Sequence, residues 1–446
     1  MNFATRLKIA LVGDANARFV YLNNFEVERS WAKGEPALPG AGIAFAATTV
    51  NRMEELGVLL ASDDDVVVLK APVDPGYAAY LSRLEAAAGR TLWAENSDPA
   101  RTVTEDALVS PELLAALREL NDGRTYLMPL GISPAEEELS KETGLPLAGP
   151  SAQTCKAVNG KIFSRRLVDT HGLRRVPGAV VETADQLAGA LEEHLLPGSK
   201  AVVKESLGVS GRGMVVLDDV KRGERLVRMV NRRGEHERVD YVVEQWIDKV
   251  LDLNYQVIVS RKGEVSFEAV KAAVVQDGVH KGHMFPVALT ADQLRELEEA
   301  GEVIGRVLFA EGYFGVVGID AMLGRDGTVF PCLEINARFN MSTYQSRIAE
   351  RFVGEGKHAV AATIGLRPHR RHTFDEVVTA LGDLLHDGSD RPGFLINNFA
   401  TLNAAASEGT QFHGRIYGIC IADDPAAALA LRADVERALT ELVAQP

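Results

Sequence analysis

Three oxygen-bearing side chains at the ends of two apolar segments are the residues best suited to chemistry in this sequence. Asp320 lies in the first segment, and Glu334 and Asn336 lie at the end of the second. The segments flank residues 324–327 (GRDG), a sequence typical of a β-hairpin turn. The two-residue spacing places Glu334 and Asn336 on one face of a strand. Such a cluster suits Mg²⁺, a hard ion that takes one or two carboxylates and lets nucleotide phosphates complete its shell. An ordinary exposed hairpin is the alternative interpretation.

The register of this hairpin decides whether Asp320 joins the other two side chains. A two-residue turn at 326–327 would place Asp320 opposite Leu333, with Glu334 on the wrong face. A three-residue loop at 326–328 pairs Asp320 with Glu334 and collects all three side chains. The magnesium interpretation therefore predicts the three-residue loop.

Length and composition bound the elements that must position these residues. A chain of 446 residues is too long for one core, so we expect two or three domains. The net charge of −14 argues against a nucleic-acid or anionic-membrane partner, although a local basic pocket for phosphates remains compatible with it. The three cysteines are far apart in sequence, which fits a reducing compartment. Because the N-terminus lacks a secretory apolar core and no apolar run reaches about 18 residues, we predict a cytoplasmic protein.

The first 150 residues alternate between predicted strands and helices. Short apolar runs at 8–13, 65–69 and 126–130 indicate buried parallel strands, with helical stretches such as 111–119 between them. This order predicts an open, doubly wound α/β domain. No G-x-G-x-x-G fingerprint follows the first run, so a dinucleotide site is unsupported. The segment 23–42 either reaches an active site or covers a sheet edge, and we favour the edge.

A glycine-rich loop joins two predicted strands in the middle of the chain. The strand 201–204 ends in Lys204, the loop 205–213 contains three glycines, and the strand 214–217 follows. Glycines allow close approach of the backbone to a ligand, and their N–H groups can surround an anion. The strand–loop–strand order excludes a Walker P-loop. The adjacent lysine favours a phosphate-binding loop over a merely flexible hairpin.

Two further polar positions interrupt predicted elements. The strand 241–247 (YVVEQWI) carries Glu244, and a carboxylate in a buried strand is costly unless a partner satisfies it. An adenine amino group or a backbone neighbour would serve. The histidines at 280 and 283 are expected in a loop that faces substrate or phosphate, because no further ligands for zinc lie nearby in sequence.

The region after the hairpin is less informative. We expect a helix at 357–364, a basic linker at 367–372, and a final segment that contains a helix, two strands at 393–397 and 415–421, and a C-terminal helix. This last segment is too small for confident independence. We therefore expect it to pack on the preceding domain.

The order of these features resembles the ATP-grasp superfamily of carboxylate–amine ligases, and within it the peptide ligases of actinobacterial natural-product biosynthesis. The resemblance covers residues 1 to about 365 and rests chiefly on Asp320 and the 334–338 stretch (EINAR). It implies an α/β ATP-grasp fold with a pre-ATP-grasp domain at 1–150 and an ATP-grasp domain at 151–366. The lid of the second domain would span about 176–250, and a small α+β extension would occupy 367–446.

The resemblance also assigns nucleotide contacts, residue by residue. Two lysines would bind the ATP phosphates, a mobile loop would fold over them, and a hinge would contact adenine through one side chain and two backbone groups. These residues are, in that order, Lys161 and Lys204; Ser210, Gly211 and Gly213; and Glu244, Gln245 and Ile247. Asp252 is the candidate for the ribose hydroxyls, with Asp248 close enough to compete.

The remaining assignments concern the metal and the acyl group. Asp320, Glu334 and Asn336 match the magnesium ligands, and Arg338 matches a cation beside the transferred phosphate or acyl phosphate. Gly318 departs from the pattern, because dipeptide-forming relatives often carry arginine there. The oxyanion-stabilising group would then come from one of three other residues, namely Lys271, Lys281 or His283.

The implied activity is an ATP- and Mg²⁺-dependent ligation through an acyl phosphate. The expected partners are a small carboxylic acid donor and an amine or peptide acceptor, in a monomer or a homodimer. A purine- or carboxylase-type enzyme of central metabolism and a non-catalytic nucleotide-binding module are the alternative hypotheses.

Overall fold

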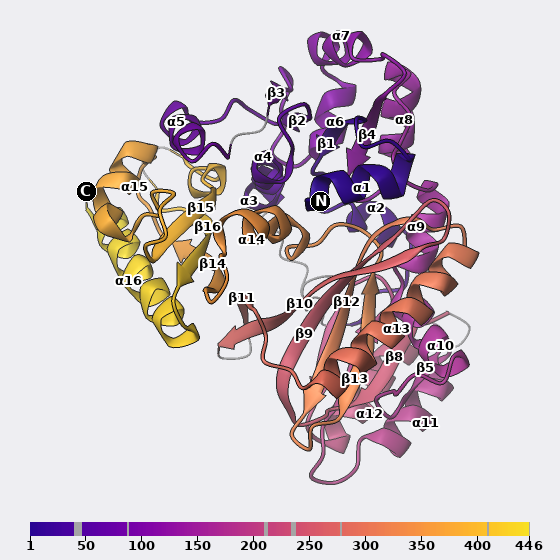
Figure 1. The fold of residues 1–446 in the computed structure, drawn as a ribbon. Coiled ribbons are helices and arrows are strands. Elements are labelled where there is room, and N and C mark those ends of the chain that lie inside the picture. Colours follow the sequence, from indigo (N-terminus) through magenta and orange to yellow (C-terminus); the bar gives the residue numbers. More distant parts are fainter. Residues whose placement is uncertain are drawn as a thin grey trace.

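Three lobes surround a common centre in the computed structural model of the chain (Figure 1). The structure describes residues 1–39, 47–86, 89–208, 213–232, 238–276, 279–407 and 410–445. The side chains of residues 47, 275, 276 and 279–281 lie outside this description. Within the described residues, no helix has both the length and the apolar character needed to cross a membrane.

The N-terminal lobe is built on a four-stranded parallel sheet of order β3-β2-β1-β4. Its strands are β1 (Arg18–Leu22), β2 (Val66–Leu69), β3 (Arg90–Trp93) and β4 (Thr125–Pro129). The helices of this lobe are α1 (Phe3–Val12), α2 (Glu28–Ala32), α3 (Ala47–Asn51), α4 (Gly57–Leu60), α5 (Pro75–Arg83), α6 (Val103–Leu108), α7 (Pro111–Glu119) and α8 (Pro134–Thr143). The predicted strands at 65–69 and 126–130 are confirmed. The prediction of an open parallel sheet with intervening helices is confirmed as well.

The strand predicted at residues 8–13 is wrong, because this segment belongs to helix α1. The Asn2 side chain accepts a hydrogen bond from the Thr5 N–H and caps the helix, and Gly13 ends it with φ of 77°. Phe3, Leu7 and Leu11 recur every four residues and are fully buried. The predicted strand began at residue 8, so it left out Phe3 and Leu7, the two residues that reveal the helical spacing.

The lid carries a second four-stranded sheet, of order β5-β8-β6-β7 and fully antiparallel. Its strands are β5 (Gly178–Val181), β6 (Ala201–Glu205), β7 (Met214–Leu217) and β8 (Tyr241–Gln245), and its helices are α11 (Ala184–His194) and α12 (Val220–Asn231). Helices α9 (Ala152–Val158) and α10 (Lys161–Thr170) lead into it. The strands that flank the glycine-rich loop and the strand that carries Glu244 are thus confirmed.

The third sheet has eight strands in the order β13-β12-β9-β10-β11-β14-β16-β15. They are β9 (Lys249–Val259), β10 (Val265–Gln276), β11 (Val279–Phe285), β12 (Gly315–Gly324), β13 (Val329–Asn336), β14 (His358–Leu366), β15 (Gly393–Asn398) and β16 (Gly414–Ala422). Helix α13 (Ala291–Ala310) buries its apolar side against β9, β10 and β13. The opposite face of β9 carries Asp252, Asn254 and Gln256, because successive residues of a strand alternate between its faces.

Two predicted elements in this sheet are wrong. The histidines at 280 and 283 lie in strand β11, not in a loop, and residues 358–364 of the helix predicted at 357–364 belong to strand β14. β14 is hydrogen-bonded between β11 and β16, so tertiary pairing overrides the alanine-rich local sequence. Through β14 the sheet continues into the C-terminal lobe, which also contains helices α14 (Ser346–Phe352), α15 (Phe374–Leu381) and α16 (Pro425–Ala444). The C-terminal segment therefore packs on the preceding part of the chain, as predicted.

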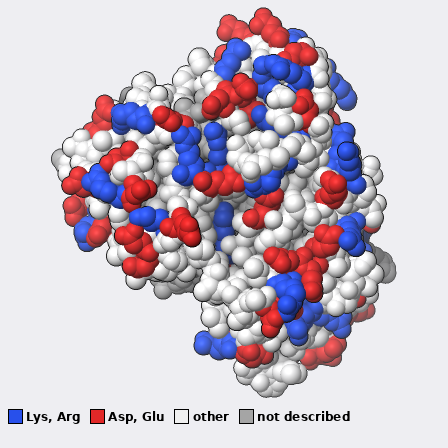
Figure 2. Space-filling view, in the orientation of Figure 1, with Lys and Arg blue, Asp and Glu red and all other residues white. Residues whose placement is uncertain are grey.

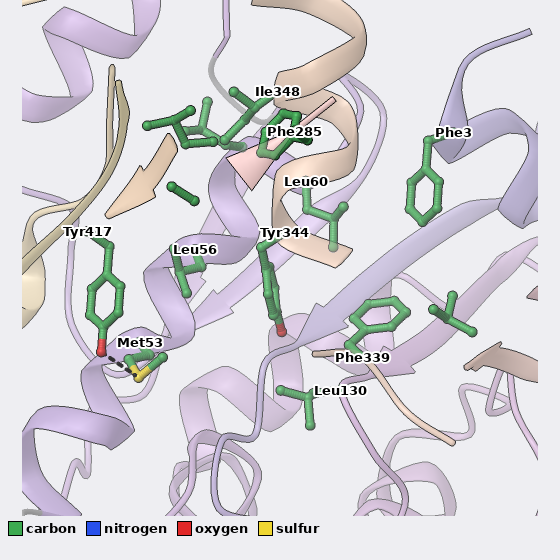
Figure 3. Packing of buried hydrophobic residues seen from close by; sticks show 14 of the residues in the cluster. Phe3, Met53, Leu56, Leu60, Leu130, Phe285, Phe339, Tyr344, Ile348 and Tyr417 are labelled. Atoms are coloured by element: carbon green, nitrogen blue, oxygen red, sulfur yellow. Dashed lines mark hydrogen bonds between the residues drawn. The ribbon is translucent and has the colours of Figure 1, made fainter. Parts of the chain in front are cut away.

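An apolar cluster at the junction of the lobes anchors the segment that follows β13. The Phe339 N–H donates to the Leu130 carbonyl at 2.9 Å, and the Tyr344 hydroxyl donates to Asn23 Oδ1 at 2.8 Å. Both rings point into the junction, where Tyr417 also contacts Met53 (Figure 3). Leu130 and Asn23 follow the carboxyl ends of β4 and β1, the edge of a parallel sheet where ligands commonly bind. The N-terminal lobe therefore fixes the chain directly after the predicted metal ligands.

Candidate active site

Four polar side chains form one row across adjacent strands of the large sheet. Strand register pairs Lys271 of β10 with Asn254 of β9, Asn254 with Asp320 of β12, and Asp320 with Glu334 of β13. Directly paired residues of antiparallel strands project from the same face. The row therefore places a buried amine and the two candidate metal carboxylates on one surface of the sheet.

The pairing of Asp320 with Glu334 is present, but the loop that was expected to produce it is not. The Gly324 N–H donates to the Thr328 carbonyl at 2.8 Å, so the three-residue loop is 325–327, one residue earlier than predicted. The pairing then shifts by two residues between Met322 and Asp320, because β13 contains a bulge. Pro331 lies within that bulge, where a residue without an N–H is tolerated. The bulge preserves the face on which Glu334 lies.

The three candidate magnesium ligands lie together. Asp320 Oδ1 accepts a hydrogen bond from the Asn254 amide at 2.7 Å, and Asp320 Oδ2 accepts one from the Asn336 amide at 3.2 Å. Burial and the nearby charge of Glu334 raise the pKa of Asp320 to about 6. Two facing carboxylates in a buried site favour a cation between them, so the donor set fits a magnesium ion. Within the described residues, no group of three or more His, Cys, Asp or Glu side chains is placed to hold a metal ion, so the third ligand of this donor set is the amide of Asn336.

Both predicted lysines reach this site and are largely buried. Lys161 is the first residue of α10, and its Nζ donates to Glu334 Oε1 at 2.7 Å and to the Gly208 carbonyl at 2.5 Å. Lys204 Nζ donates to Glu244 Oε2 at 2.6 Å. Burial alone would lower the pKa of Lys204, but the charges of Glu244, Glu334 and Asp320 raise it above its ordinary value. Two ammonium groups thus face the carboxylates across the space between lid and sheet.

The predicted hinge residues lie on strand β8, which pairs with the strand of Lys204, and in the connection that follows β8. Glu244 is buried in β8, and Ile247 is half-buried in the connection to β9. Gln245 donates its backbone N–H to the Pro177 carbonyl at 2.9 Å, which excludes that N–H as a ligand for the base. Asp252 lies two residues before Asn254 and therefore on the same face of β9, with Lys249 at 2.6 Å.

Asp248, which competes with Asp252 as the candidate for the ribose hydroxyls, is exposed and pairs with Arg325 at 2.5 Å. This placement favours Asp252.

In the glycine-rich loop, Ser210 and Gly211 lie outside the described residues. Gly213 adopts φ of 73°, and its carbonyl accepts the Glu205 N–H at 2.7 Å, so it closes the hairpin onto β6.

Arg338 connects the hairpin to the N-terminal lobe. Its guanidinium donates to Asn336 Oδ1 at 2.9 Å, and its Nε lies 2.7 Å from Glu28 Oε1. Glu28 begins α2, within the segment 23–42 that was expected to cover a sheet edge. That expectation is wrong for this part of the segment. The loop reaches the site because Trp31 packs in the core and donates its indole N–H to the Ile132 carbonyl at 3.0 Å.

The space beside Gly318 is filled by a neighbouring amide. A Cβ atom on Gly318 would lie 1.8 Å from Asn340 Nδ2. The Asn340 side chain contacts Gln256 and the Thr343 N–H, so it is held in that position. A larger residue at 318 is therefore incompatible with this arrangement of the segment after β13.

The candidates for an oxyanion-stabilising group lie at the far end of the row. Lys271 is fully buried, and its Nζ donates to the Ser342 carbonyl at 2.7 Å and to Gln345 Oε1 at 3.2 Å. Burial lowers its pKa to about 7. His283 Nδ1 lies 3.4 Å from the Gln345 amide. The side chain of Lys281 lies outside the described residues.

Four residues of this site were missed from the sequence. They are Glu28, Arg165, Asn254 and Asn340. Asn254 had a usable signal, since polar residues alternate with apolar ones in β9. The other three meet their partners only through the folding of distant segments. At the surface, acidic and basic side chains are interspersed, and the visible face is hollowed where the lobes meet (Figure 2).

Comparison with known proteins gives matches to two family models. The pre-ATP-grasp domain model matches residues 53–145, and the ATP-grasp domain model matches residues 166–340. The second match includes Lys204 and all three candidate metal ligands, whereas Lys161 lies before it.

Among curated proteins, the chain is 32% identical over 228 residues to the [butirosin acyl-carrier protein]–L-glutamate ligase of Niallia circulans, an alignment that covers 50% of this chain and 53% of that one. It is 23% identical over 236 residues to an N5-carboxyaminoimidazole ribonucleotide synthase of Brucella melitensis, covering 52% and 62%. The chain thus spans only about half to three-fifths of the length of these relatives.

Solved structures share the fold across nearly the whole chain. An ADP complex of purK, an N5-carboxyaminoimidazole ribonucleotide synthetase, superposes with a TM-score of 0.54 and 15% identity, covering 95% of this chain and 98% of that one. The biotin carboxylase domain of the 2-oxoglutarate carboxylase of Hydrogenobacter thermophilus, solved with MgADP and bicarbonate, gives a TM-score of 0.53 and 14% identity, covering 94% and 89%.

Proposed function

The chain belongs to the ATP-grasp superfamily, and from that premise we propose that it is an ATP-dependent amide ligase. It joins the carboxylate of a small, modified amino acid to the amine of a peptide and releases ADP and phosphate. The observation that carries this proposal is the convergence of Asp320, Glu334 and Asn336 with Lys161 and Lys204 between lid and sheet.

ATP and Mg²⁺ are the nucleotide and metal of this site. Asp320, Glu334 and Asn336 would hold the metal, which supplies charge neutralisation to the phosphates of ATP. The pKa of Asp320 is raised first by burial and then by the charge of Glu334, and a bound cation would offset both effects, which supports this assignment.

The first half-reaction is the attack of the substrate carboxylate on the γ-phosphate of ATP, which gives an acyl phosphate and ADP. The attacking carboxylate and the triphosphate repel each other, so the site must neutralise both. Lys161 and Lys204 bind the phosphates, and Arg338 holds the incoming carboxylate beside the transferred phosphoryl group. The site must also exclude water, because the acyl phosphate hydrolyses when water enters.

The second half-reaction is the attack of the amine on the acyl carbon, which expels phosphate. Lys271 is the candidate that stabilises the developing oxyanion, since it lies on the face that carries Asp320 and Glu334. Asn340 occupies the place that a side chain at 318 would need. The donor that would stabilise the oxyanion therefore comes from another strand.

The relatives suggest two other candidate functions. The Niallia circulans relative is named as a ligase of an acyl-carrier protein and L-glutamate. An acceptor held on a carrier protein is therefore the second candidate. Two carbamoyl phosphate synthase large chains and an N5-carboxyaminoimidazole ribonucleotide synthase, at 23–27% identity in sequence, suggest an enzyme of central metabolism as a third candidate. The higher identity to an amino-acid ligase favours the first two.

A screen for ADP release separates these hypotheses. The protein is mixed with ATP, Mg²⁺ and pairs of amino acids with free peptides or carrier-bound amines, and the products are weighed by mass spectrometry. An amide product accompanied by ADP supports the proposal. A carboxylated product with bicarbonate supports the carboxylase type, and absence of turnover with retained ATP binding supports a non-catalytic module. Light scattering in the same buffer decides between a monomer and a homodimer.

A further inference from the structure

Arg165 lies where helix α10 meets the first strand of the lid. We propose that Arg165 is a positioning residue that holds Glu244 for the adenine base and remains its counter-ion when Lys204 turns to the phosphates of ATP. This inference rests on the proposed function, because it takes Glu244 as the adenine contact and Lys204 as a phosphate ligand.

The guanidinium of Arg165 is fixed by several acceptors. Its NH1 and NH2 groups donate to the carbonyls of Val176 at 2.9 Å and Gly178 at 2.6 Å, and its Nε donates to Asp169 at 3.1 Å. The side chain is only 4% exposed. A planar guanidinium with this many acceptors has one orientation, so it can position a neighbour precisely in space.

Glu244 is shared between two cations. Its Oε2 accepts from Lys204 at 2.6 Å, and its Oε1 lies 3.4 Å from the NH1 group of Arg165. A buried carboxylate that loses its partner is strongly disfavoured. The charges of Glu334 and Asp320 also raise the pKa of Lys204, so these carboxylates lie near enough to act on its ammonium group. When Lys204 binds phosphate, Arg165 is the cation that remains beside Glu244 and holds it in place.

The backbone of β5 is shaped to allow this contact. A Cβ atom on Gly178 would lie 2.2 Å from the Val243 carbonyl and 2.9 Å from Glu244 Cγ. Only glycine therefore lets β5 approach β8 closely enough for its carbonyl to accept from Arg165 beside Glu244. The same helix, α10, carries Lys161 four residues earlier, on the same side. One short helix thus connects the metal side of the site to the adenine side.

The test measures nucleotide binding, so it needs no knowledge of the acid or amine. Dissociation constants for MgATP, MgGTP and magnesium tripolyphosphate are determined by calorimetry for the wild type, Arg165→Met and Arg165→Lys. We expect Arg165→Met to weaken MgATP binding roughly tenfold, the lower end for a hydrogen bond to a charged group. MgGTP and magnesium tripolyphosphate should be weakened less, because they lose only the counter-ion of Glu244 and not the adenine contact. Arg165→Lys keeps the positive charge but loses the planar guanidinium, so its dissociation constant for MgATP should lie between those of the wild type and Arg165→Met. Arg166→Met is the matched control, because Arg166 is exposed and pairs with Glu182 at 2.9 Å.

Equal weakening of all three ligands by Arg165→Met, or no weakening, would overturn the positioning role. Failure of the wild type to bind MgATP would overturn the proposed function itself, so the two failures are distinguishable. If circular dichroism shows that Arg165→Met does not fold, Arg165→Lys decides by the same comparison.

A double-mutant cycle gives an independent answer. In a Glu244→Gln background, Arg165→Met should cause no further loss of the preference for ATP over GTP. A further loss as large as in the wild-type background would show that Arg165 does not act through Glu244.

Discussion

Glu28 Oε1 lies 2.7 Å from Arg338 Nε, although 310 residues separate them in sequence. The side chains are 14% and 12% exposed, so the pair is largely withdrawn from solvent. Arg338 follows the candidate metal ligand Asn336 by two residues and donates to it. The N-terminal lobe thus places a carboxylate where the acid substrate is proposed to bind.

Removal of this carboxylate should strengthen anion binding at Arg338. We expect Glu28→Gln to lower the dissociation constant for inorganic phosphate, measured by calorimetry in the presence of MgADP, by about tenfold, or ~1.4 kcal/mol. Glu35→Gln is the control, because Glu35 lies on the same segment but pairs with Lys156 at 2.6 Å. Unchanged or weaker phosphate binding in Glu28→Gln would show that Glu28 does not compete for Arg338.

Gly318 and Asn340 should be coupled in stability. Gly318→Ala places a Cβ atom against Asn340 Nδ2, so the amide must move, and we expect a loss of about 1–3 kcal/mol in the free energy of unfolding. Asn340→Ala opens that space, so the double variant should be less destabilised than the sum of the single variants. Chemical denaturation of the four proteins measures this, and strict additivity would contradict the contact.

Lys271 should make stability depend on pH. Because burial lowers its folded-state pKa to about 7 from an ordinary 10.5, the unfolded state binds more protons between these values. The free energy of unfolding should therefore rise with pH across this window, by up to about 1.4 kcal/mol per unit. Lys271→Met should flatten the slope, as followed by urea denaturation from pH 7 to 10. Lys262→Met, at an exposed position, should retain it; equal slopes in both variants would contradict the assignment.

Two substitutions should abolish turnover without unfolding the protein. Lys204→Ala removes a phosphate ligand and Glu334→Gln removes a metal ligand, so each should lower kcat at least about a hundredfold, or ~2.7 kcal/mol in the barrier. The exposed Glu302→Gln should leave it unchanged. ADP formation measures the rate, and circular dichroism checks the fold.

The sequence predicted the strands of the site better than its contacts. The segments around Asp320 and Glu334 are recognisable because apolar runs flank a glycine-rich turn, and their pairing follows from the side-chain period of two. The loop was misplaced by one residue, and the bulge that corrects the register could not be seen, because Pro331 is equally compatible with a strand end.

The errors elsewhere have a common cause. Residues 8–13 and 357–364 are short apolar segments, for which periodicity does not distinguish a helix from a strand. Residues 358–364 form a strand because β11 and β16 pair with them. Glu28, Arg165 and Asn340 were missed for the same reason, since each reaches the site through a contact with a distant segment that no local pattern encodes.

The most direct test of the central claim is the stoichiometry of nucleotide products. The protein is incubated with ATP, Mg²⁺ and the acid–amine pair identified by the screen, and ADP, AMP and amide are quantified by chromatography. Activation through an acyl phosphate predicts one ADP for each amide, no AMP, and neither product with Glu334→Gln. Formation of AMP and pyrophosphate, or normal turnover in that folded variant, would contradict the account.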